Sequence, residues 1–272
     1  MILRSPVVAG SFYPENPVQL RREVESYLQG KSENPAPDLN PQALIVPHAG
    51  YYYSGAVAGS AYRLIKNQDY DLVVVLAPSH RHYFTGASIY SIGNYATPLG
   101  EIVVATDLAE SLIAEYPEIN FIAEAHHQEH SLEVQLPFLQ VTLDKFTLLP
   151  VVLGQQNWSQ AEKLAEIFAG LAINRRLLLI ASTDLSHFHD AATAEILDQR
   201  IIDAVAAFDP ESFYSLIEQR QAEACGAGPL LTVMLAAKKM AAERVEILSY
   251  RHSGHISGDN ERVVGYLAAA IT

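Results

Sequence analysis

Leu72-Val-Val-Val-Leu-Ala-Pro-Ser-His80 is the stretch that decides the fold of this chain. It is an unbroken apolar run that ends in a histidine, and two other runs have the same form: Ala43-Leu-Ile-Val-Pro-His48 and Leu177-Leu-Leu-Ile-Ala-Ser-Thr-Asp-Leu-Ser-His187. Continuous apolar runs are typical of parallel strands that are buried on both faces. In open α/β sheets, ligands bind beyond the carboxyl ends of such strands. We therefore expect three imidazoles to converge on one crevice.

Segments with helical periodicity alternate with the apolar runs along the whole sequence. This alternation predicts one α/β domain over residues 1–272, with a central, mixed and mostly parallel sheet flanked by helices on both faces. Helices are expected at 17–29, 54–66, 107–115, 131–142, 159–171, 191–207, 210–221 and 229–242, and further strands at 87–92, 101–105, 146–153, 245–251 and 262–269. The proline-rich stretch 34–41 is expected to join an amino-terminal helix to the first core strand.

The composition excludes several classes of partner and location. The 18 basic and 31 acidic residues give a formal charge of −13, which repels phosphate backbones and anionic lipids, so we expect no binding to nucleic acid or membranes. A single cysteine cannot form an intramolecular disulfide, and no leader-like or membrane-spanning apolar segment is evident. These features predict a cytoplasmic protein.

Two polar clusters and the cysteine follow or join the apolar runs. Asp184 precedes His187 by three residues, so it either supports the histidine ring by accepting its N–H or caps a following helix. Glu129 and His130 lie near a predicted helix start, from which they can reach the crevice. The adjacent His126 and His127 are instead expected to be solvated loop residues.

Cys225 stands in the glycine-rich segment Cys225-Gly-Ala-Gly-Pro229, which is typical of a loop that enters a helix. A buried cysteine is often only a small apolar side chain. A thiolate at a helix amino terminus is nevertheless stabilised by the helix dipole and by a nearby metal ion. With two histidines close by, a metal-ligand role is the favoured interpretation.

Taken together, the motifs resemble those of the MEMO family, which includes the AmmeMemoRadiSam system protein B of bacteria and archaea. The matching segments follow one another in order over nearly the whole chain: Ala9-Gly-Ser-Phe-Tyr-Pro14, Pro47-His-Ala-Gly-Tyr51, Pro78-Ser-His80, Glu129-His-Ser-Leu-Glu133, Ser182-Thr-Asp-Leu-Ser-His187, Cys225-Gly226 and Gly258-Asp-Asn260. Several motifs in a fixed order are far more specific than any one of them.

The resemblance implies a fold similar to that of the class III extradiol dioxygenases, whose non-haem iron lies in a cleft at the sheet edge. By this resemblance the metal ligands match His48, His80 and Cys225. The acid/base histidine matches His187, with Asp184 beside it. The residues expected to line the same pocket are Glu129, His130 and Tyr51.

One difference from the dioxygenases bears on the cofactor. Those enzymes use two histidines and a carboxylate, whereas this chain offers a thiolate, which is softer and can itself be oxidised. We therefore expect one metal ion, iron(II) or copper with zinc as a further option, and we do not assign ring cleavage. The family name also associates such proteins with AMMECR-type and radical-SAM proteins, which are expected partners on that ground alone.

Three functions remain open from the sequence. The first is a non-haem metalloprotein that carries out redox chemistry on a small molecule. The second is a module without catalytic activity that binds a peptide or a phosphotyrosine group in the same cleft, with Arg81 and Arg251 as the nearest cations. The third is a hydrolase-like enzyme in which Cys225 is a nucleophile activated by a histidine.

Overall fold

The three apolar runs form neighbouring strands, β2 (Ala43–Val46), β9 (Leu177–Ser182) and β3 (Leu72–Pro78), in that spatial order. They belong to a computed structural model that describes residues 2–30 and 39–272. The three strands are parallel, and their register places Val46 opposite Ser182 and Leu76 opposite Ala181. Their carboxyl ends therefore meet at one edge of the sheet, as predicted.

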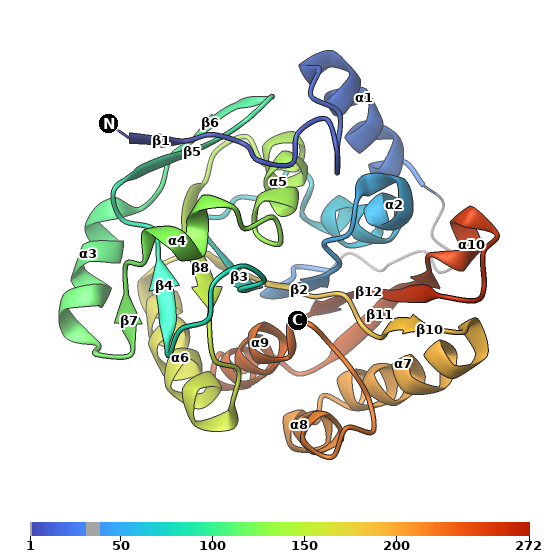
Figure 1. The fold of residues 1–272 in the computed structure, drawn as a ribbon. Coiled ribbons are helices and arrows are strands. Elements are labelled where there is room, and N and C mark those ends of the chain that lie inside the picture. The colour runs from blue at the N-terminus through green and yellow to red at the C-terminus, as the bar shows by residue number, and fades with distance from the viewer. Residues whose placement is uncertain (1, 31–38) are drawn as a thin grey trace.

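The other elements surround these three strands (Figure 1). The remaining strands are β1 (Ile2–Arg4), β4 (Ala87–Ile89), β5 (Gly93–Thr97), β6 (Gly100–Ile102), β7 (Ile119–Asn120), β8 (Thr147–Leu153), β10 (His187–His189), β11 (Val245–His252) and β12 (Val263–Ile271). The α-helices are α1 (Pro17–Leu28), α2 (Tyr51–Tyr62), α3 (Thr106–Glu115), α4 (Ala123–His127), α5 (Leu136–Thr142), α6 (Trp158–Leu171), α7 (Ala191–Ala206), α8 (Pro210–Glu218), α9 (Ala227–Lys239) and α10 (Gly254–Ser257). Short 3-10 helices cover Arg63–Ile65, Glu133–Gln135 and Ala172–Asn174.

The main sheet is mixed, with a parallel centre. Its strand order over the described ranges is β10-β12-β2-β9-β3-β8-β4-β7, and β11 also pairs with β12. β2, β9, β3 and β8 are parallel, whereas β12 runs antiparallel to β2 and β4 runs antiparallel to β8. The chain is thus a single α/β domain, which confirms the predicted class. A small second sheet, β1-β5-β6, is not predicted by the sequence patterns.

Each face of the main sheet carries its own hydrophobic core. Along β2, Leu44 and Val46 contribute to one core while Ala43 and Ile45 contribute to the other, because successive side chains of a strand point to opposite faces. α1, α2 and α5 cover the first face, and α6, α7, α8 and α9 cover the second (Figure 1). Burial on both faces explains why these strands read as continuous apolar runs.

The predicted helices are present with shifted ends. Asn16 caps α1 through its side chain, and Pro17 follows it as the first helical residue. The segment predicted at 54–66 begins earlier, at Tyr51, and the one predicted at 131–142 divides into a 3-10 turn and α5. The α6 cap is Asn157, whose side chain accepts the Gln160 N–H.

Two further sequence expectations concern membrane-spanning helices and the proline-rich stretch. No helix in the ranges 2–30 and 39–272 has both the length and the apolar character needed to cross a bilayer. The proposed linker at 34–41 lies mostly outside the described residues, so its predicted role stays a prediction.

Candidate metal centre

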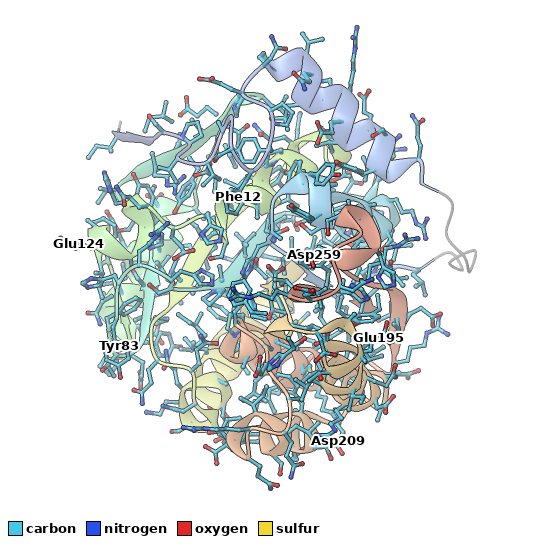
Figure 2. All side chains as sticks on the ribbon, turned by 45° about the vertical axis from the view of Figure 1, so that its right-hand side comes forward. Phe12, Tyr83, Glu124, Glu195, Asp209 and Asp259 are labelled. Carbon is cyan, nitrogen blue, oxygen red and sulfur yellow. The ribbon has the colours of Figure 1, made fainter. Side chains whose placement is uncertain are left out.

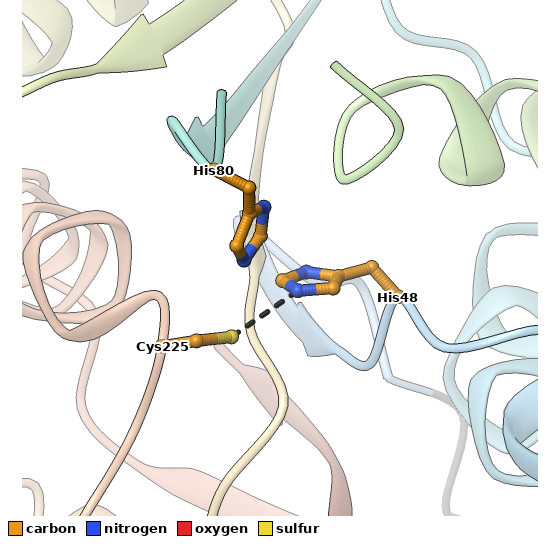
Figure 3. A group of neighbouring side chains, drawn as sticks. All are labelled: His48, His80 and Cys225. Carbon is orange, nitrogen blue, oxygen red and sulfur yellow. Dashed lines mark hydrogen bonds between the residues drawn. The ribbon is translucent and has the colours of Figure 1, made fainter. Parts of the chain in front are cut away.

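Three side chains from distant parts of the sequence meet beyond the carboxyl edge of the sheet. His48 follows β2, His80 follows β3, and Cys225 lies in the loop that enters α9 (Figure 3). Cys225 Sγ is 3.1 Å from His48 Nε2, and one ligand atom from each of the three residues lies within 4.8 Å of the others. His48, His80 and Cys225 therefore lie together, whereas His187, the third imidazole expected here, is not part of this group, and metal binding itself stays a prediction.

The hydrogen bonds of His48 fix which ring nitrogen faces the centre. Ser182 Oγ donates its proton to the Ser131 carbonyl oxygen at 2.6 Å, so this hydroxyl accepts a hydrogen bond from His48 Nδ1 at 3.0 Å. Gln135 Nε2 also donates to Ser182 Oγ, at 2.8 Å. His48 Nδ1 consequently carries the ring proton, and the lone pair of Nε2 points toward Cys225 Sγ.

His80 has the same arrangement with a charged partner. Its Nδ1 lies 2.9 Å from Glu129 Oε1, and because a carboxylate oxygen only accepts, Nδ1 is the donor. Glu129 Oε2 accepts the His80 backbone N–H at 2.6 Å, which holds the main chain as well as the ring. Burial opposes ionisation of Glu129, but the bonds from His80 and Ser131 outweigh it and lower the pKa to about 2. His80 Nε2 is thus left free for a ligand.

Backbone contacts hold the cysteine loop in place. The Cys225 N–H donates to the Asp184 carbonyl oxygen at 3.1 Å, and Gln156 Nε2 donates to the Cys225 carbonyl oxygen at 3.0 Å. A Cβ atom on Gly226 would collide with the Ser182 carbonyl oxygen and with Thr183. Glycine is therefore required here for a close approach of two loops rather than for a positive φ.

Burial favours the neutral forms of the His48 and His130 rings and of the Cys225 thiol. Burial, and then repulsion by His80, lowers the pKa of His48 well below its usual range. Burial also lowers the pKa of His130 to about 4, against the attraction of Glu129. The pKa of the Cys225 thiol is raised by burial and by Asp184. A free thiolate is disfavoured in this setting unless a cation accompanies it.

The expected pairing of Asp184 with His187 is wrong. Asp184 Oδ1 accepts the His48 backbone N–H at 2.8 Å, while His187 Nδ1 lies 2.8 Å from the Leu185 carbonyl oxygen and donates to it. No helix begins directly after Asp184, because residues 187–189 form β10 instead, so the alternative capping role is wrong as well. Burial raises the pKa of Asp184 to about 7, against the opposing backbone N–H of His48.

Of the residues expected to line the pocket, two lie at the centre and one lies behind it. The His130 ring is 4.8 Å from the His80 ring and 5.6 Å from the His48 ring, between centroids, and Glu129 contacts both His80 and His130. Tyr51 is 3% exposed, and its hydroxyl donates to the Val134 carbonyl oxygen. Tyr51 thus supports the site from the core instead of lining an open pocket.

His126 and the cations require two further corrections. His126 is not solvated: it is 1% exposed and its ring nitrogens contact Tyr95 and Ser88. His127 is exposed as expected, but both residues lie on α4 and not in a loop. Arg81 is close enough to His130 to lower its pKa. Arg251 lines a different hollow, together with residues of α1 and α2. Only one of the two proposed cations therefore accompanies the centre.

Several supporting residues are not predicted by the sequence. Ser182 and Gln135 set the ring orientation of His48, and Gln156 braces the cysteine loop. Ser182 has a sequence signal, since it ends an apolar strand inside a recognised motif. Gln135 and Gln156 have none, because their partners are brought to them only by the tertiary fold.

The donor set fits a transition metal ion. Each imidazole offers Nε2 while its Nδ1 is held by an outer hydrogen-bond partner, which is the usual arrangement of metal-binding histidines. Two imidazoles and a thiolate suit copper, zinc or iron better than the hard cations magnesium and calcium. Fold and site thus define an α/β protein with a His-His-Cys candidate metal centre.

Comparison with known proteins identifies the family of the chain. The family model described as Memo-like protein matches residues 4–270. A MEMO1 family protein of Methanosarcina barkeri is 37% identical over 99% of this chain and 100% of its own length. A MEMO1 family protein of Nitrosopumilus maritimus is 34% identical over 97% of this chain and 98% of its own length. The chain therefore belongs to the Memo family.

A solved structure also shows a likeness. An uncharacterized protein of Escherichia coli K12 aligns with a TM-score of 0.48 and 14% identity, over 84% of this chain and 99% of that one.

Proposed function

We propose that this protein binds one transition metal ion, iron(II) or copper with zinc as a further option, through His48 Nε2, His80 Nε2 and Cys225 Sγ. The observation that carries the proposal is the pair of fixed tautomers. Ser182 accepts the Nδ1–H of His48 and Glu129 accepts that of His80. The Nε2 lone pairs of both rings are therefore left beside the sulfur of the chain's single cysteine. Such an ion would supply redox or Lewis-acid chemistry at the cleft.

The surrounding residues suit proton handling during redox chemistry on a small molecule. His187 donates Nδ1–H to the Leu185 carbonyl oxygen, so its Nε2 carries a lone pair that can accept a proton. Burial lowers the pKa of His187, which keeps the ring neutral at pH 7. Asp184 has a pKa of about 7 and can hold or release a proton beside His48 and Cys225. We assign these roles to His187 and Asp184 separately, since they do not contact each other as a pair.

The same observations rank the alternative functions lower. A nucleophilic thiol needs a depressed pKa, whereas burial and Asp184 raise that of Cys225. A phosphotyrosine module needs a focused basic pocket, and the −13 chain offers only Arg81 of the two expected cations near the centre. The hydrolase-like alternative does have a Cys–His contact, Cys225 Sγ to His48 Nε2 at 3.1 Å, but the raised pKa of the thiol ranks it below metal binding.

Elemental analysis of protein purified without oxygen tests the proposal. The wild type is expected to carry one equivalent of iron, copper or zinc at this centre. His48→Ala and Cys225→Ser should fold, as judged by circular dichroism, and lose that equivalent. Full metal content in both variants would rule out the proposed ligands.

A further inference from the structure

A second group of potential ligands lies outside the centre, at the outer side of β11. It consists of Glu195 on α7, His252 at the end of β11 and His255 on α10, and it shares no residue with the first centre. One ligand atom from each residue lies within 4.8 Å of the others. Glu195 and the nearby residue Asp259 lie on the same side of the molecule (Figure 2).

His252 is the fixed member of this group and is poorly satisfied. It is 2% exposed, and its Nδ1 has no hydrogen-bond partner within the described part of the chain. Its Nε2 lies 3.4 Å from Glu195 Oε1, which is long for a hydrogen bond. A buried polar group with so few partners is costly unless another group binds to it.

His255 completes the group from the solvent side. Its ring stacks on that of His252 with centroids 3.7 Å apart, and its Nδ1 accepts the His252 backbone N–H at 3.1 Å. That bond shows that a lone pair of His255 faces inward instead of toward bulk water. Both Glu195 and His255 are exposed and can adjust their side chains, while His252 stays in place.

The charges around the group favour a cation. His252 presents a buried ring nitrogen, Nδ1, without a hydrogen-bond partner among the described residues. Glu195 supplies one negative charge at the group, and the buried Asp198 lies close enough to act on the same ring. Two imidazoles and a carboxylate are a donor set that zinc uses in sites with an open fourth position.

We propose that Glu195, His252 and His255 form a second site for a zinc-like divalent transition metal ion. Bonds of about 2.0–2.2 Å hold ligand atoms about 3.3–3.6 Å apart around a tetrahedral ion, so a pair of ligand atoms near the 4.8 Å limit must approach by up to about 1 Å. When an ion binds, His255 gives up the hydrogen bond that it accepts from the His252 backbone N–H and forms a bond to the ion instead. The expected affinity is therefore moderate, below that of a preformed structural zinc site.

An ion at this second site would also stabilise the segment that carries His187. Asp198, on the same helix as Glu195, accepts the Ser186 N–H at 2.9 Å and the Tyr250 hydroxyl at 2.7 Å. Ser186 immediately precedes His187, so the ion would tie α7, β11 and α10 together beside the segment that carries this histidine. An occupied second site would thereby stabilise this segment without touching the first centre.

Zinc titration by calorimetry, with equilibrium dialysis and elemental analysis, tests this proposal on the full chain. The wild type should take two equivalents of Zn²⁺, and His255→Asn should take one. Asparagine can still accept the His252 N–H, so this variant removes the ligand while keeping the local hydrogen bond. Loss of an outer hydrogen-bond partner alone weakens metal binding about 10–100-fold, so loss of a ligand should weaken the second equivalent by at least about 10-fold. His127→Asn, at another exposed histidine, is the matched control and should bind as the wild type does.

Two further variants separate this site from the first one. Cys225→Ser should lose the sulfur-to-metal charge-transfer band of the Co²⁺-loaded protein and retain the equivalent that depends on His255. If the first centre does not exist, the wild type will take a single equivalent that His255→Asn removes. Binding that is the same in Cys225→Ser and in Cys225→Ser/His255→Asn would overturn the second site.

Discussion

Glu129→Gln is the substitution that most directly probes how the chain orients its candidate ligands. Glu129 Oε1 accepts bonds from His80 Nδ1 at 2.9 Å, from the Ser131 N–H at 3.0 Å and from Ser131 Oγ at 2.8 Å. Its side chain is 1% exposed, and its pKa of about 2 lies about 2.5 below the usual value of 4.5. That difference corresponds to about 3 kcal/mol in favour of the ionised form.

The expected effect on metal binding follows from these contacts. Glutamine keeps one oxygen that can accept the His80 N–H, but it removes the charge that strengthens the bond. Loss of such an outer partner weakens metal affinity about 10–100-fold, and we expect Glu129→Gln near the lower end and Glu129→Ala near the upper end. Competition of each variant with a chelator of known affinity gives the dissociation constant, and Glu124→Gln on the exposed face of α4 is the control.

The same substitution has a pH signature. A carboxylate whose folded pKa is depressed stabilises the fold above its unfolded pKa, and the contribution disappears as the pH falls through the folded value. The difference in unfolding free energy between wild type and Glu129→Gln should be complete above about pH 4.5 and should vanish toward pH 2. A dissociation constant within twofold of the wild type, in both Glu129→Gln and Glu129→Ala, would refute the reasoning.

Three further substitutions test other parts of the account. Burial lowers the pKa of His126 to about 3, so the unfolding free energy of the wild type should fall by up to about 1.4 kcal/mol per pH unit as the pH drops below about 6.5. The unfolding free energy of His126→Gln, measured by urea unfolding at several pH values, should depend less steeply on pH. Gly226→Ala should cost about 1–3 kcal/mol and displace Cys225, and a variant that keeps both stability and metal would contradict the close approach to Ser182. Phe138→Ala should cost about 3–5 kcal/mol in thermal or urea unfolding, because its ring is 1% exposed and stacks on Tyr62; a loss below about 1 kcal/mol would contradict this.

The sequence predicts the centre of the fold better than its margins, for a physical reason. A strand buried on both faces, such as β3, must be apolar throughout, so its pattern survives without knowledge of its neighbours. The short strands β1 and β5 have no such pattern. Arg4 on β1 contacts Glu133 and the carbonyl oxygens of His126 and Glu129, so the position of β1 depends on residues more than 100 positions away.

The same limit applies to the candidate centre. His48 and His80 are predictable because strand ends in a parallel sheet share an edge. The link between Asp184 and His187 is inferred from local spacing and is wrong, because the chain after β9 extends into β10 instead of turning as a helix. Sequence spacing locates side chains near one another only where the secondary structure between them is known.

X-ray absorption at the zinc edge of the Zn²⁺-loaded His255→Asn protein tests the central claim most directly. This variant removes a ligand of the proposed second site and leaves His48, His80 and Cys225 intact. The account predicts one sulfur neighbour at about 2.3 Å and two imidazole nitrogens at about 2.0–2.1 Å. A first shell without sulfur would contradict it.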